Sequence, residues 1–146
     1  GLLKVRKLTD YSLGLYAARA MRSWVESAAH THLSESDIPL VGYVPDFIYA
    51  PELRYLDEVE SGLEASVRCT SIAAQLELIA GGAGIGVLPH FMACHDERLV
   101  RICPDVSITR SFWLAVHRDV AGQPRVRAFI DWLLELVKSG ATTLQQ

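Results

Sequence analysis

Hydrophobic and polar positions alternate along this chain in patterns that predict short strands separated by helices. Residues 3–8 and 12–17 are typical of two strands around a turn at residues 9–10, and the second is apolar enough to be buried on both faces. Residues 21–28 place apolar side chains at helical spacing, which predicts the first helix. Residues 38–43 then predict a short buried strand.

The middle of the chain continues this pattern. Residues 51–59 predict a short helix, and residues 63–70 alternate strictly between apolar and polar side chains, as in a half-exposed strand. Ser71 is placed to cap the helix that follows, at residues 72–80. That helix is apolar around most of its circumference, so we expect it to be largely buried.

The last third predicts three more strands and one long helix. Residues 84–89, 97–103 and 111–117 are the strands, and an apolar stripe along residues 126–137 marks a helix that packs on the core and ends at Gly140. Strands that alternate with helices predict right-handed crossovers and a largely parallel sheet.

Composition narrows the class of protein. The chain has 146 residues, with 14 Lys and Arg against 17 Asp and Glu and a net charge of −3, which argues against DNA binding by this stretch itself. The apolar runs are shorter than a membrane span requires, and no signal-peptide pattern opens the chain. We therefore expect a cytoplasmic protein without membrane contact. Because the chain begins at Gly1 and enters a strand at once, we expect it to be part of a longer protein.

The cysteines and glycines support structural roles. Cys69, Cys94 and Cys103 are odd in number and scattered, so we expect reduced and mostly buried thiols. The glycine cluster at residues 81–86 invites a nucleotide-binding interpretation, but a phosphate loop follows a strand and opens a helix. Here the helix comes first, so a helix-to-strand turn is predicted.

Metal binding has little support from spacing. His90, Cys94 and His95 form one candidate group, and His30 with His32 forms another. Neither group has the spacing that converges on a tetrahedral ion, so we expect solvated loop residues and no metal or cofactor.

Thr70 and Ser71 are the best candidates for a ligand site. They lie where a strand ends and a helix begins, which is the edge at which open α/β sheets bind ligands, and helix N-termini favour anions. Ser71 can equally be a cap alone. An enzyme would depend on Ser71 as nucleophile, but no G-x-S-x-G motif or paired base supports one, so no catalytic residue is proposed.

An ordered series of segments resembles the effector-binding domain of LysR-type transcriptional regulators. The resemblance covers nearly the whole chain, and no single motif in it is decisive. The segments are "LLKVRKLTDYSLGLYAA", "SESDIPLVGY", "YAPELRYLDEV", "TSIAAQLELIAGGAGIGVLP", "ERLVRIC" and "FWLAVHRDVAGQPRVRAFIDWL".

The resemblance implies an α/β fold like the type II periplasmic binding proteins, with two lobes of mainly parallel sheets joined by two crossover strands. Residues 1–17 and 109–146 would be the remainder of an incomplete first lobe, and residues 18–108 the second lobe. The family's N-terminal winged helix-turn-helix is absent from this chain, so DNA would be bound only through that missing part. A small-molecule effector, for which we expect an anionic metabolite, and a homodimer or homotetramer are the implied partners.

The family's effector-binding positions can be matched to individual residues of this chain. The resemblance suggests effector-binding residues after the first strand of the second lobe, at the turn into the helix at residues 72–80, and at one basic position of the first lobe. These residues are Tyr43, Val44, Phe47, Thr70, Ser71, Ile72 and Arg6. Arg6 can alternatively be a strand residue that faces water. The alternative function is a solute-binding protein of a transport system, which shares the two-lobed fold.

Overall fold

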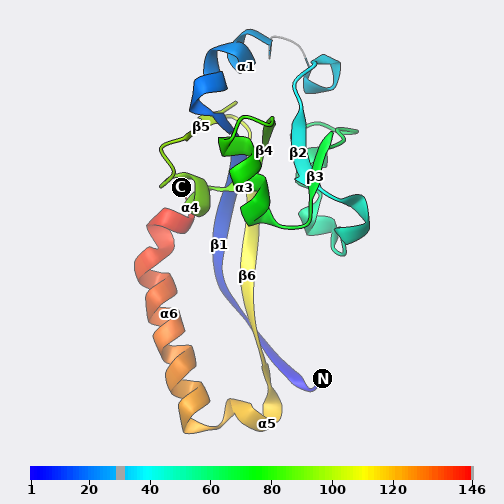
Figure 1. The fold of residues 1–146 in the computed structure, drawn as a ribbon. Helices are drawn as coiled ribbons and strands as arrows, with labels where there is room; N and C mark the ends of the chain where they lie inside the picture. The colour runs from blue at the N-terminus through cyan, green and yellow to red at the C-terminus, as the bar shows by residue number, and fades with distance from the viewer. Residues whose placement is uncertain (29–31, 146) are drawn as a thin grey trace.

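One long strand organises the structure, a computed structural model that describes residues 1–28 and 32–145. Strand β1 (Leu3–Ala18) pairs antiparallel with β6 (Ile108–His117) from Leu3 to Leu13, and together they form the two-stranded ribbon that extends away from the rest of the sheet (Figure 1). The predicted turn at residues 9–10 is therefore wrong. Only a register irregularity between Lys7 and Thr9 interrupts the pairing. β6 continues past this irregularity and keeps both halves of β1 extended.

The sheet combines a parallel part with an antiparallel part. Its order is β3-β2-β4-β1-β5, where β2 is Leu40–Tyr43, β3 is Val67–Cys69, β4 is Ile85–Pro89 and β5 is Leu99–Ile102. β2 runs parallel to both β3 and β4, whereas β1 runs antiparallel to β4, β5 and β6. The parallel pairing expected from sequence is thus limited to β2, β3 and β4, because β1 runs in the opposite direction and pairs with β4, β5 and β6.

The glycine cluster forms the predicted turn between α3 (Ile72–Ala80) and β4. Gly82 has φ +83°, a left-handed conformation that glycine adopts without strain. At Gly84, a Cβ would lie 2.3 Å from the backbone oxygen of Pro39. α3 itself is less buried than expected. Only Gln75 and Ile79 are buried in it, because the helix covers one face of the sheet and turns its outer side to solvent.

Short helical segments lie in most of the connections between the strands. In β3, only Val67–Cys69 pair, although burial alternates along residues 63–70 as predicted. The segments are η1 (Arg19–Met21), α1 (Arg22–Ala28), η2 (Leu33–Glu35), η3 (Pro45–Phe47), η4 (Pro51–Leu53), α2 (Tyr55–Val59), α4 (His90–Ala93) and α5 (Arg118–Ala121).

The long helix α6 (Pro124–Gln145) runs back alongside the ribbon (Figure 1). Its predicted end at Gly140 is wrong, since the helix continues for another turn. Its predicted core stripe is not buried either. Phe129 and Trp132 are 56% and 57% exposed, and the described side chains of the helix are at most partly buried. The apolar face of α6 therefore has little to pack against in this chain.

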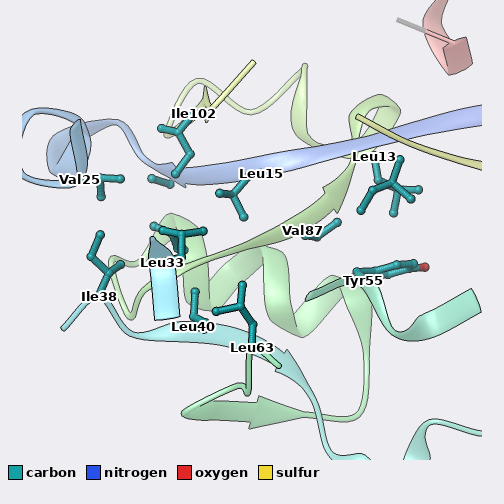
Figure 2. Close-up of a cluster of buried hydrophobic side chains, with 13 residues drawn as sticks. Leu13, Leu15, Val25, Leu33, Ile38, Leu40, Tyr55, Leu63, Val87 and Ile102 are labelled. Atoms are coloured by element: carbon teal, nitrogen blue, oxygen red, sulfur yellow. The ribbon is translucent and has the colours of Figure 1, made fainter. Parts of the chain in front are cut away.

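Apolar side chains pack on both faces of the sheet. Leu15 and Val87 belong to the cluster shown in Figure 2, while their neighbours Tyr16 and Leu88 belong to a second cluster with Ile79 of α3. Alternation along β1 and β4 explains this division, because successive side chains point to opposite faces. Burying one leucine such as Leu15 contributes about 1.5–3 kcal/mol to stability.

Two further sequence expectations concern the cysteines and membrane-spanning helices. Cys69 and Cys103 are partly buried and Cys94 is exposed, so the thiols are less buried than expected, and all three are free. Among the described helices, none combines the length and the apolar character needed to cross a bilayer.

Candidate functional site

The carboxyl ends of parallel strands meet at one edge of the sheet. We call residues 43–47 and 69–72 the carboxyl edge. The amide of Val44, which follows β2, donates to the carbonyl oxygen of Cys69 at the end of β3, at 3.1 Å. Ser71 then caps α3, where its Oγ accepts a hydrogen bond from the Ala74 amide at 3.2 Å. The cap predicted from sequence is confirmed.

This edge collects most of the residues that the family resemblance suggested. Tyr43 and Val44 are partly buried, and burial raises the pKa of the Tyr43 hydroxyl. Phe47, at the end of η3, is exposed, as are Thr70 and Ser71. Ile72 opens α3 and is partly buried. The edge therefore presents hydroxyl groups and the start of a helix beside exposed aromatic surface.

Arg6 is not brought to the carboxyl edge. It lies opposite Leu114 in the ribbon and is exposed. Tyr11, which takes part in the aromatic contacts near the edge, comes five residues later on the same strand. At the rise of an extended strand, this separation is about 16 Å.

A groove of about 580 Å³ lies between the ribbon and the segments η4 and α2. Its lining includes Tyr11, Leu53, Tyr55, Glu58, Arg110 and Trp113. Arg110, on β6, forms a two-fold ion pair with the Glu58 carboxylate, and one of the two contacts is Nη1 to Oε2 at 3.3 Å. Its Nε donates to the carbonyl oxygen of Glu52 at 2.9 Å. The Glu58 carboxylate raises the pKa of Arg110, so this guanidinium stays charged.

Tyr55 connects the groove to the carboxyl edge. Its side chain is 7% exposed, and burial raises the pKa of its hydroxyl. Its ring centroid lies 6.2 Å from that of Tyr43, and the neighbouring Tyr11 raises the pKa of its hydroxyl further. Arg110 lies over the ring, with Cζ 5.7 Å from the centroid. Figure 2 shows the Tyr55 oxygen pointing away from Leu63.

Further aromatic side chains lie along the ribbon next to the groove. Tyr11 stacks on Phe112 with ring centroids 4.3 Å apart, and Phe91 meets Tyr11 edge-on at 5.8 Å. Sequence analysis did not nominate Tyr11, Tyr55 or Arg110. Tyr11 adjoins the predicted crossover strand, which is the signal that could have drawn attention to it.

Of the histidine and cysteine residues considered for metal binding, His90 differs from the sequence expectation. His90 is not a solvated loop residue, since it begins α4 and its Nδ1 shares a short hydrogen bond with the Tyr16 hydroxyl. Burial lowers the pKa of His90 and raises the pKa of Tyr16 to about 12. Cys94 and His95 are exposed after α4, as expected. His30 lies outside the described residues, and within them no cluster of three His, Cys, Asp or Glu side chains is placed to hold a metal.

The arrangement defines a class of ligand-binding protein. The antiparallel strands β1 and β6 extend out of a sheet that helices cover, and this sheet also contains the parallel strands β2 and β3. This is the α/β architecture of type II periplasmic-binding-protein-like domains. Ligands of such sheets bind at the carboxyl ends of the strands.

The sequence itself identifies the family. It matches the LysR substrate binding domain over residues 2–138, and the chain belongs to this family. No curated protein sequence matches it.

Solved structures with the same fold include regulatory domains and one full-length regulator. The effector domain of AmpR from Pseudomonas aeruginosa superimposes with a TM-score of 0.68 at 21% identity, covering 97% of this chain and 67% of that one. The regulatory domain of CrgA from Neisseria meningitidis gives 0.74 at 18% identity, covering 93% and 69%. Full-length LysG from Corynebacterium glutamicum gives 0.64 at 18% identity, covering 95% of this chain and 46% of LysG.

These findings establish the biological class. The chain is an effector-sensing domain of the LysR type, and the transport-protein alternative is not favoured. The family is one of regulators, which also points away from the enzyme alternative.

Proposed function

We propose that this domain senses a small anionic metabolite, which binds at the carboxyl edge beside Ser71 and Thr70. The observation that carries the proposal is the convergence of β2 and β3 at that edge, where the Val44 amide meets the Cys69 carbonyl and the capped helix α3 begins. The positive end of a helix dipole favours a carboxylate.

The surroundings of the edge supply the remaining features of an effector site. Tyr43 offers a hydroxyl group and an aromatic face, and Phe47 offers exposed apolar surface. Arg6, on the ribbon, belongs to the proposed site only if the lobes bring it toward the ligand. The solved LysG structure with a bound effector, Arg, supports a ligand of amino-acid size.

We also propose how the chain divides and assembles. Residues 18–108 would form the second lobe, and residues 1–17 with 109–146 the remainder of the first. Exposed apolar side chains on those end segments, such as Val5 and Trp132, support a missing partner layer. A winged helix-turn-helix outside this chain would bind DNA, and the cytoplasmic protein would form a homodimer or homotetramer. Light scattering on the intact protein tests the assembly, and a monomer would refute it.

A ligand acts on such a protein only through its different affinity for two arrangements of the lobes. Binding also raises the free energy of unfolding, by about 2.7 kcal/mol when the ligand is at one hundred times its Kd. A thermal-shift screen of the intact protein with dicarboxylates, hydroxy acids and aromatic carboxylates should therefore find a compound that raises Tm by several degrees.

Substitution at Ser71 tests the location. Ser71→Trp should abolish the shift, because its side chain blocks the start of α3, while the ligand-free Tm stays within a few degrees. Ser23→Trp is the matched control, since Ser23 is exposed on α1, and it should keep the shift. A full shift in Ser71→Trp, or a panel without any active carboxylate, would count against the proposed site.

A further inference from the structure

A second cavity, of about 290 Å³, lies beside β2 and shares Leu53 and Tyr55 with the groove. Its volume is near the lower end of the range for small-molecule pockets, about 300–1,000 Å³. The lining combines apolar and polar side chains, and its apolar part includes Val41, Tyr43, Leu53, Tyr55, Leu63 and Val87. Tyr55, Leu63 and Val87 all belong to the apolar cluster drawn in Figure 2.

Gln75 gives this cavity a specific polar group. Its side chain, from α3, lines the cavity and is 1% exposed. Among the described residues, its Nε2 has no hydrogen-bond partner. A buried amide without a partner is unfavourable, and proteins usually satisfy such groups. An acceptor oxygen on a molecule in the cavity would satisfy it.

The charges around the cavity balance one another. Arg54 lies 3.9 Å from Asp57, and Arg68 lies 3.8 Å from Glu64, each distance measured between the charged atoms. These four residues line the cavity but are exposed, so they belong to its solvent side. With two cations paired to two anions, the cavity has no net charge that would favour an ion.

We propose that this cavity binds a compact, uncharged molecule whose carbonyl oxygen accepts a hydrogen bond from Gln75 Nε2. The cavity shares Tyr43 and Pro45 with the carboxyl edge, but the proposal rests on Gln75 and not on the anion site. Tyr55 of α2 borders both the cavity and the groove, so a molecule bound here contacts a residue that also lines the groove.

Two probes of the same shape test the hydrogen bond directly. Acetophenone carries the carbonyl oxygen, and α-methylstyrene replaces it with a methylene group. In NMR titrations of the intact protein, acetophenone should bind saturably and shift the side-chain amide protons of Gln75. α-Methylstyrene should bind on the order of fivefold more weakly, the factor that one hydrogen bond of ordinary net strength supplies.

Gln75→Met keeps the shape of the side chain and removes the donor. It should fold, because it replaces an unpartnered polar group with an apolar one, and it should bind the two probes equally. Gln123→Met is the matched control, since Gln123 precedes α6 and does not line the cavity, and it should keep the preference.

Three results would overturn the proposal. One is the absence of saturable binding by either probe, which would leave a cavity that holds only water. Another is equal affinity of the two probes for the unmodified protein, a comparison that stands even if Gln75→Met fails to fold. The third is shifts centred on Trp113 of the groove in place of Leu63 and Val87.

Discussion

The ion pair between Arg110 and Glu58 should hold the crossover strand β6 against α2. The Arg110 side chain is 14% exposed and that of Glu58 is 45% exposed. Arg110 also donates to the carbonyl oxygen of Glu52 at 2.9 Å. Replacing the guanidinium by Arg110→Met therefore removes the ion pair and leaves a carbonyl group without its donor.

The magnitude follows from this partial burial. Exposed ion pairs contribute about 0.2–1 kcal/mol, and breaking a fully buried one costs about 3–5 kcal/mol. With one buried partner and one half-exposed partner, we expect a coupling free energy of about 1–2 kcal/mol between Arg110 and Glu58. Arg110→Met alone should destabilise the protein by about 2–3 kcal/mol, including the lost bond to Glu52. At about 2–4 °C per kcal/mol for a chain near this size, Tm should fall by about 4–12 °C.

Urea denaturation followed by circular dichroism measures this coupling in a double-mutant cycle of Arg110→Met and Glu58→Gln. The matched control is the cycle of Arg98→Met and Glu77→Gln, because Arg98 also pairs with both carboxylate oxygens, at 3.0 Å each, but both side chains are more than half exposed. The Arg110 coupling should be the larger and should persist in molar salt. Equal couplings in the two cycles would refute the reasoning.

Other predictions address the turn, the helix and the pH response. Gly84→Ala should destabilise the protein by about 1–3 kcal/mol in urea, because the added Cβ meets the Pro39 carbonyl. Gly140→Ala should stabilise it by about 0.5–1 kcal/mol, since the added Cβ meets nothing and α6 continues through this position; a loss would place the helix end there. Burial lowers the pKa of His90, so the unfolded state binds the proton first, and stability should fall as pH drops below about 6.5; His90→Gln should flatten this slope. Burial raises the pKa of Tyr16, so stability should also fall between pH 10 and about 12, and Tyr16→Phe should reduce that loss, to which Tyr43 and Tyr55 also contribute.

Local patterns predicted most elements correctly. The cap at Ser71 and the turn at residues 81–84 were predicted because each depends on neighbours within a few residues. The alternation along residues 63–70 predicted burial correctly but not the length of β3, since pairing depends on where β2 ends. Six of the seven residues that the family resemblance suggests for effector binding lie at the carboxyl edge and Arg6 does not, while their role in binding stays a prediction.

The errors arose where a distant segment decides the outcome. The turn at residues 9–10 was expected from two polar residues between apolar runs, yet β6 pairs across them and keeps β1 extended. α6 was expected to pack on a core and stop at Gly140, but little in this chain covers its apolar face, and the helix continues. α3 was expected to be largely buried, but only one side of it faces the sheet.

The candidate sites likewise combine features that follow from local sequence with features that follow from contacts between distant segments. The sequence by itself determined the family, the order of elements and the residues that end β2 and begin α3, because periodicity, capping and turn preferences act within a few residues of the chain. Only the tertiary structure decided that Tyr11, Tyr55 and Arg110 meet, and that the Gln75 amide is buried in a cavity without a partner. Those contacts join residues far apart in sequence. They depend on which strands pair and in what register, and this is a property of the whole sheet.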